Sequence, residues 1–108
     1  MDKFELGDIV LLNFPFTNAD KVKKRPALVI KDFNDGDLLV CRITSKQYNS
    51  KFDIPIYNYQ ECGLILASYI RVHKIATLEA NMVEKLIGKT DKHHISKVKN
   101  VFSNLIEV

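Results

Sequence analysis

Long apolar runs are missing from the start of this chain, where a targeting or membrane-spanning segment would be found. The first apolar run covers residues 9–12. It is far too short for the core of a signal peptide, or for the ~20 residues that a membrane-spanning helix needs. We therefore expect a cytoplasmic protein that does not associate with membranes.

Cysteine is also scarce, and the familiar catalytic and metal-binding motifs are missing. Cys41 and Cys62 are the only cysteines and form no Cys-x-x-Cys pair, so free thiols are expected. His93 and His94 are adjacent and would diverge by ~100° on a helix, with no His or Cys three or four residues further on. No phosphate-binding glycine loop, serine nucleophile elbow or carboxylate pair stands out. We expect no metal and no other cofactor.

The remaining composition is that of an ordinary globular protein. The chain has 108 residues, of which 46% are hydrophobic and 27% are charged, and its four glycines are scattered. No repeat or Pro/Gly-rich linker divides it, so we expect one domain over residues 1–108.

A small positive charge permits an anionic partner without requiring one. The formal net charge is +3 and the pI is about 8.9. Four cations gather within residues 21–25, and further lysines recur within residues 89–99. Solvated turns and helix faces are the alternative interpretation of both groups.

Hydrophobic patterning predicts short strands first and helices last. The expected strands are residues 9–14, 26–30, 38–44 and 52–57, with one or two more within residues 64–78. The first strand should be buried on much of both faces and end at Pro15. A polar, basic loop over residues 17–24 should precede Pro26, placed at the first position of the second strand. Residues 34–37 have the composition of a hairpin turn.

Two helices are expected after residue 79. Met82, Val83, Leu86 and Ile87 predict a short helix that Gly88 ends. The apolar residues of a second helix recur at three- and four-residue spacing, and they are Ile95, Val98, Phe102, Leu105 and Ile106. Thr90 or Asp91 can cap its start. This order of elements indicates a small barrel with helical additions.

Three polar positions are candidates for chemistry. Pro26 forces Arg25 into an extended conformation at a strand start, where its guanidinium can bind phosphate oxygens; a surface ion pair is the alternative. Thr44 and Ser45 place hydroxyls at a strand rim, although such residues often bond only to local backbone. Arg71 and His73 share a strand face, and His73 titrates near neutrality. A half-exposed structural histidine is the alternative there.

Taken together, several ordered motifs resemble the MazF/PemK family of toxins over nearly the whole chain. They are GDIVL at residues 7–11, KRPALVI at 24–30, ITS at 43–45, SYIRV at 68–72, TL at 77–78 and IG at 87–88. The resemblance implies a mainly β fold, an SH3-like barrel of the CcdB/MazF type with short helices and a C-terminal α-helix. It also implies a homodimeric, metal-independent endoribonuclease that cleaves single-stranded RNA, including mRNA, at short sequences and thereby inhibits translation and growth. A cognate antitoxin would occupy the RNA groove with a disordered tail, and DNA would be contacted only through the antitoxin complex.

The resemblance assigns residue roles by matching motif. Arg25 would stabilise the phosphorane and Thr44 would orient the 2′-hydroxyl or a phosphate oxygen, because the RNA's own 2′-hydroxyl is the nucleophile. Part of the family has an Arg-x-Asp pair where this chain has Arg71 and His73, so His73 is the expected acid or base, with a rate that responds to pH between roughly 5 and 8. RNA contacts are expected from Thr17, Asn18, Lys23, Lys24, Ser45 and Arg71, the first two on a loop that closes over the RNA.

Two other functions compete with the nuclease. A CcdB-like toxin of the same fold would bind DNA gyrase without catalysis, but such proteins resemble one another in a Trp-Gly-Ile terminus, and this chain ends Leu-Ile-Glu-Val and has no tryptophan. A non-catalytic barrel could bind nucleic acid through the basic residues 21–25 alone.

Overall fold

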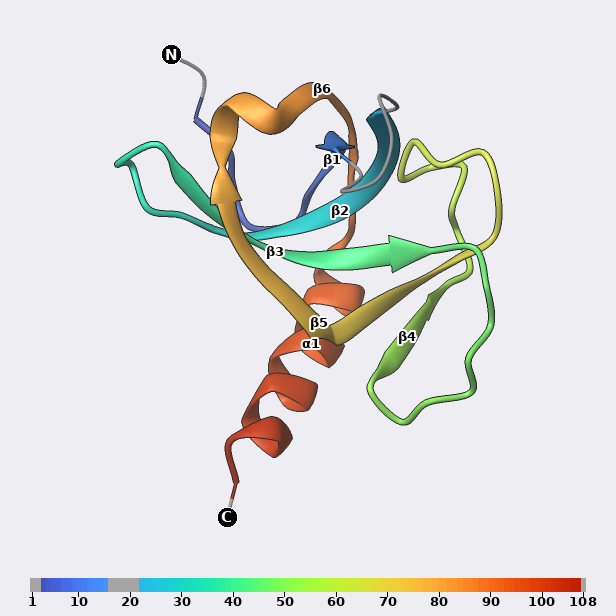
Figure 1. Ribbon diagram of the computed structural model, residues 1–108. Coiled ribbons are helices and arrows are strands. Elements are labelled where there is room, and N and C mark those ends of the chain that lie inside the picture. Colours follow the sequence, from blue (N-terminus) through green and yellow to red (C-terminus); the bar gives the residue numbers. More distant parts are fainter. Residues whose placement is uncertain (1–2, 16–21, 108) are drawn as a thin grey trace.

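The computed structural model describes residues 3–15 and 22–107, which form a curved six-stranded antiparallel sheet and a C-terminal helix (Figure 1). The elements are β1 (Asp8–Pro15), β2 (Val22–Asp32), β3 (Asp37–Thr44), β4 (Asp53–Ile56), β5 (Ser68–Glu79), the short 3-10 turn η1 (Ala80–Met82), β6 (Val83–Lys89) and α1 (Lys92–Leu105). The strand order is β4-β5-β3-β2-β1-β6. The predicted mainly β fold with a C-terminal helix is confirmed.

The sheet separates two hydrophobic cores. On one face, Ile9 and its buried neighbours on β2, β3, β4 and β5 pack against Val98 of α1. On the other face, Val10, Leu12 and residues of β2 and β3 pack near Phe4 and Met82. β1 is therefore buried on both faces, as its continuous apolar run predicts.

β2 begins earlier than expected. Lys23 and Lys24 pair with Phe14 and Asn13 of β1, so the prediction of a loop through residue 24 is wrong at its end. Pro26 lies opposite Leu11 inside the strand, not at its first position. The backbone of β1 continues to Pro15, and pairing with it outweighs the polar character of the lysines.

The short helix predicted after residue 79 is also wrong. After η1, β6 pairs with β1 on the edge that β2 leaves open, with Val10 opposite Leu86 and Ile9 opposite Gly88. The apolar residues have helical spacing, but this segment forms a strand because the open edge of β1 supplies a row of backbone hydrogen-bond partners.

The C-terminal helix and the hairpin turn follow the sequence signals. Asp91 caps α1, its side chain accepting a hydrogen bond from the backbone N–H of His94 at 2.9 Å. In the turn between β2 and β3, Asn34 and Gly36 have positive φ values of 61° and 98°.

Two smaller predictions can also be checked. Cys41 and Cys62 are free and buried, as expected, and burial raises the pKa of the Cys41 thiol to about 12. Over residues 3–15 and 22–107, no helix is long and apolar enough to span a membrane.

Candidate functional site

Arg25, near the start of β2, and Thr44, at the end of β3, line one pocket. Ala27 lies opposite Arg42 in this antiparallel pair, and Arg25 and Thr44 lie two residues beyond them on their own strands, on the same face. The pocket has a volume of about 410 Å³, and we call it the Thr44 pocket. Its other polar lining residues are Lys24, Ser45, Ser68 and Lys85, and the segment 63–66 forms one wall.

The two predicted catalytic side chains are held differently. The Thr44 hydroxyl accepts a hydrogen bond from the backbone N–H of Lys46 at 3.2 Å, which leaves its own O–H free to donate. Thr44 is almost fully buried, whereas Arg25 is partly exposed and forms no ion pair with another described residue. The pocket thus offers a fixed hydroxyl beside an uncompensated guanidinium.

The wall of the Thr44 pocket depends on two glycines that touch. Gly63, with φ of +90°, crosses β6 so closely that an added Cβ would lie 2.0 Å from the carbonyl oxygen of Ile87. A Cβ on Gly88 would lie 1.8 Å from the carbonyl oxygen of Cys62. Only glycine at both positions allows the 63–66 segment to lie against β6 and close the pocket.

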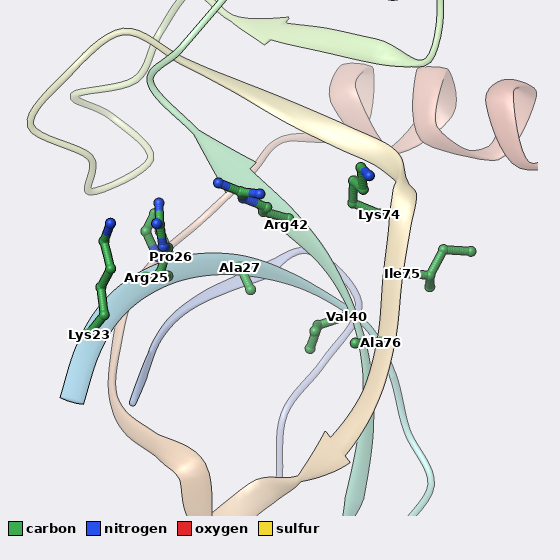
Figure 2. Close-up of a pocket in the computed structure, with 9 residues that line it drawn as sticks. All are labelled: Lys23, Arg25, Pro26, Ala27, Val40, Arg42, Lys74, Ile75 and Ala76. Carbon is green, nitrogen blue, oxygen red and sulfur yellow. The ribbon is translucent and has the colours of Figure 1, made fainter. Parts of the chain in front are cut away.

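A second pocket adjoins the first and shares Arg25 (Figure 2). It has a volume of about 360 Å³, and we call it the Arg42 pocket. Its lining residues are Lys23, Arg25, Pro26, Ala27, Val40, Arg42, Lys74, Ile75 and Ala76. Four of these side chains are cations and the others are apolar.

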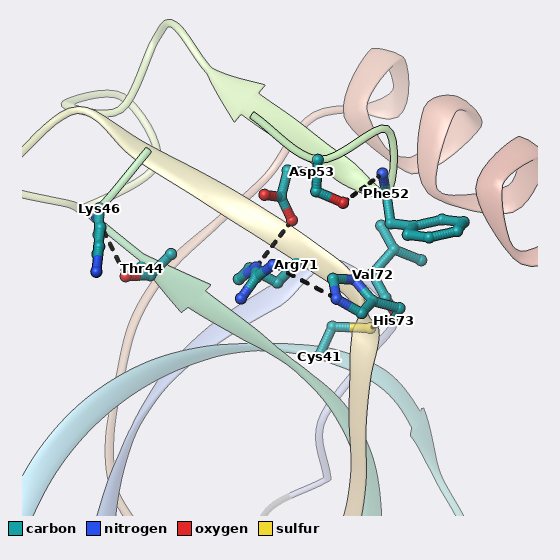
Figure 3. Close-up of polar contacts among 9 residues, drawn as sticks. Cys41, Thr44, Lys46, Phe52, Asp53, Arg71, Val72 and His73 are labelled. Carbon is teal, nitrogen blue, oxygen red and sulfur yellow. Dashed lines mark hydrogen bonds and ion pairs between the residues drawn. The ribbon is translucent and has the colours of Figure 1, made fainter. Parts of the chain in front are cut away.

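Arg71 lies in a separate, partly buried group, which we call the Arg71 cluster: Tyr48, Phe52, Asp53, Arg71 and His73. Figure 3 shows Phe52, Asp53, Arg71 and His73 of this cluster. Arg71 Nε donates a hydrogen bond to Asp53 Oδ1 at 3.0 Å, and the two side chains are only 9% and 5% exposed. The guanidinium also lies 3.8 Å from the centre of the Tyr48 ring. Arg71 is thus engaged by protein partners on several sides, so its predicted RNA contact would first have to break them.

His73 lies on an irregularity in β5. Cys41 pairs with Ile75 whereas the next residue, Arg42, pairs with Arg71, so residues 72–74 have no counterpart on β3. His73 Nε2 lies 3.4 Å from Arg71 Nη2, and its ring centre is 5.1 Å from that of Phe52. Burial and the neighbouring Arg71 charge lower the pKa of His73. His73 lines neither pocket.

The structure therefore divides the predicted site residues into two groups. Arg25, Thr44, Ser45 and Lys24 share the Thr44 pocket and Lys23 lines the Arg42 pocket, whereas Arg71 and His73 belong to the Arg71 cluster. The ammonium of Lys24 is paired with Glu84 of β6 at 2.7 Å. Thr17 and Asn18 lie outside the described residues.

Sequence reasoning missed Ser68, Lys85 and the 63–66 wall as part of this site. Ser68 opens a motif of the resemblance, but its hydroxyl donates to the Leu66 carbonyl at 2.8 Å, a local role that no pattern predicts. Arg42 could have been found, because it shares a strand face with Thr44. Among the described residues, no three His, Cys, Asp or Glu side chains gather closely enough to hold a metal ion.

Comparisons with known proteins place the chain in a family. Residues 5–106 match the model of the PemK-like, MazF-like toxins of type II toxin-antitoxin systems. No protein with a curated description matches the chain by sequence.

Solved structures share the fold at low sequence identity. A chain of the MazE-MazF crystal structure from Deinococcus radiodurans is 18% identical with a TM-score of 0.80, and the match covers 94% of each chain. An endoribonuclease from Mycobacterial species is 13% identical with a TM-score of 0.76, over 96% of this chain and 91% of that one. The Mycobacterium tuberculosis toxin MazF-mt6 is 17% identical with a TM-score of 0.72, over 90% and 93%. Because the family model matches residues 5–106, nearly the whole chain, the chain belongs to the PemK-like, MazF-like toxins of type II toxin-antitoxin systems.

Proposed function

We propose that this toxin is a metal-independent endoribonuclease that cuts single-stranded RNA, including mRNA, at short sequences in the Thr44 pocket, and so inhibits translation and growth. The observation that carries the proposal is the meeting of Arg25 and Thr44, from two strands, in one pocket. Membership of the toxin family and the endoribonuclease name of a structure with the same fold support it.

The reaction needs little from the protein besides positioning and charge. The RNA 2′-oxygen bonds to the adjacent phosphorus and the bond to the 5′-oxygen breaks, giving a 2′,3′-cyclic phosphate and a 5′-hydroxyl. One proton leaves the 2′-hydroxyl and one reaches the 5′-oxygen. Because the nucleophile belongs to the substrate, the reaction requires no metal-generated hydroxide. Arg25 stabilises the charge that develops on the phosphorane, and Thr44 donates its free O–H to the 2′-oxygen or a phosphate oxygen.

The remaining predicted residues take unequal parts in this proposal. Ser45, Lys24 and Lys23 border the pockets and would contact the RNA, and Thr17 and Asn18 remain predicted contacts. Arg71 contacts Asp53 and Tyr48, so we infer that it holds the loop after Ser45, and its RNA contact stays a prediction.

The role of His73 as acid or base stays a prediction. A response of the cleavage rate to pH between roughly 5 and 8 that disappears in His73→Gln would assign it to proton transfer. An unchanged profile would leave it as part of the Arg71 cluster.

The partners follow from family membership. We propose a cytoplasmic homodimer that is inhibited by a cognate antitoxin and contacts DNA only through that complex; the MazE-MazF name of one similar structure supports the antitoxin partner. We propose no metal and no organic cofactor.

The direct test is incubation of the purified, antitoxin-free protein with mixed-sequence single-stranded RNA in EDTA, beside Arg25→Ala and Thr44→Ala. We expect discrete cuts with 2′,3′-cyclic phosphate ends, reduced about 100-fold or more in each variant. Lys99→Ala, on α1, is the matched control and should cut like the wild type. Intact RNA after incubation with folded wild type would contradict the proposal and favour gyrase binding or RNA binding without cleavage. An assay for inhibition of purified gyrase would distinguish these two functions.

A further inference from the structure

The Arg42 pocket combines cations with an apolar floor. In Figure 2 the charged ends of Lys23, Arg25, Arg42 and Lys74 lie on the same side of the strands, with Ala27, Val40 and Ala76 below them. No carboxylate of the described residues lines the pocket. An anionic ligand with one flat or apolar part would fit both features.

Arg42 has one donor that no described residue satisfies. Its Nε is buried and has no hydrogen-bond partner among the described residues. Arg42 lies directly across from Arg71 on β5, but Asp53 compensates only Arg71. An unsatisfied donor on a permanent cation that has no carboxylate partner among the described residues is costly in the free protein, and the charge of a bound phosphate would offset that of the guanidinium.

Lys74 approaches the same pocket from the irregularity in β5. Because residues 72–74 have no counterpart on β3, Lys74 is displaced outward and its side chain is exposed. Ile75 and Ala76 then return the strand to the floor, where Ala76 pairs with Val40. The irregularity therefore places an exposed cation beside the apolar lining of the pocket, with its charged end on the same side of the strands as that of Arg42 (Figure 2).

Continuity with the Thr44 pocket indicates what the ligand is. Arg25 lines both pockets, so they adjoin, and a chain bound at Thr44 could continue into the Arg42 pocket along the protein surface. RNA carries a phosphate at every step together with a base that can lie on an apolar floor. An acidic peptide offers the negative charge but not this regular alternation.

We propose that the Arg42 pocket is a nucleotide subsite for the RNA, in which the floor receives a base or ribose next to the cleavage point and Arg42 with Lys74 binds a backbone phosphate other than the one that reacts. This inference rests on the proposed function for its register and deepens it. Arg42 and Lys74 are positioning residues that improve binding of the substrate, whereas Arg25 and Thr44 act on the reacting phosphate.

The test measures RNA binding and cleavage separately. The wild type, Arg42→Gln, Lys74→Gln and the control Lys99→Gln are titrated by fluorescence anisotropy with single-stranded RNA that carries a 2′-deoxy nucleotide at the cleavage point, in EDTA at several salt concentrations. We expect Arg42→Gln to bind about tenfold more weakly. The slope of log affinity against log salt should fall by about 0.7 for the lost phosphate contact. With RNA that keeps the 2′-hydroxyl at the cleavage point, the cleavage rate at saturation should stay within about threefold of the wild type, because the reacting pocket is intact.

A second arm locates the phosphate. A neutral methylphosphonate replaces each phosphate of the RNA in turn; at one position flanking the cut it should weaken the wild type but not Arg42→Gln. The proposal would be overturned if folded Arg42→Gln and Lys74→Gln, whose side chain is exposed in the wild type, both bound RNA with wild-type affinity. It would also be overturned if the methylphosphonate had the same effect at every position of the RNA. If Arg42→Gln bound an acidic antitoxin peptide more weakly but bound RNA as the wild type does, that result would also overturn the proposal, in favour of a peptide site. A protein that cuts no RNA but binds mixed-sequence RNA through Arg42 would contradict the nuclease and still support the subsite.

Discussion

One face of the sheet carries arginines in two different settings. Arg71 is buried against Asp53 and stacked near Tyr48, whereas Arg25 and Arg42 have no carboxylate partner among the described residues and line pockets. The residue type and the strand face are the same, so the partner decides the role. A compensated guanidinium holds the protein together, and an uncompensated one remains available for phosphate.

The largest expected effect comes from breaking the compensated pair. Asp53→Asn leaves Arg71 as a buried charge without its partner, so the free energy of unfolding should fall by about 3–5 kcal/mol. Urea unfolding followed by circular dichroism measures it.

The matched control for this pair is Lys24→Met, which removes the exposed ion pair with Glu84. It should change the free energy of unfolding by about 1 kcal/mol or less. Equal losses in Asp53→Asn and Lys24→Met would contradict the division into structural and available cations.

The wall of the Thr44 pocket should respond nearly as strongly. Gly63→Ala places a Cβ 2.0 Å from a backbone oxygen in addition to an unfavourable positive φ, so we expect a loss of about 3 kcal/mol and weaker RNA cleavage. Gly36→Ala has a similar φ of +98° but open space around its Cβ, and should lose only about 1 kcal/mol. Thermal unfolding of both variants separates the steric contact from the backbone conformation; identical losses would show that the crossing at β6 does not matter.

The smallest expected effect is on the pH dependence of stability. His94 is buried beside Thr90 at the start of α1, and burial lowers its pKa, as it does for His73. The unfolded chain, whose histidines titrate near ~6.5, then binds more protons below that pH, so stability should fall by about 1 kcal/mol from pH 7.5 to 5.5. His94→Gln should flatten this slope in urea unfolding at several pH values. A wild type that is equally stable at both pH values would contradict the neutral, buried state of His94.

The sequence predicted this architecture where local signals and tertiary pairing agree. The first strand, the Asn34 to Gly36 turn and the Asp91 cap each depend on neighbours in the chain, and all three are confirmed. β6 was mistaken for a helix because the deciding partner, the open edge of β1, is far away in sequence. In such a segment, pairing with a neighbouring strand determines the secondary structure more strongly than the spacing of apolar residues does.

The candidate site divides in the same way. Motifs identified Arg25 and Thr44, and the register of β2 and β3 brings them together. The same strand-face reasoning grouped Arg71 with His73 but did not reveal Asp53, whose position on β4 removes Arg71 from the accessible surface. The glycine crossing at Gly63 and Gly88 joins segments that no local pattern connects.

The comparison of the two kinds of arginine is tested most directly by measuring cleavage per folded molecule for Arg25→Gln and Arg71→Gln, with single-stranded RNA in EDTA. We predict that Arg25→Gln keeps wild-type stability and loses cleavage by about 100-fold or more, whereas Arg71→Gln loses about 3 kcal/mol of stability and retains most cleavage in its folded fraction. Full cleavage by Arg25→Gln, or a stable Arg71→Gln that cuts nothing, would contradict the account.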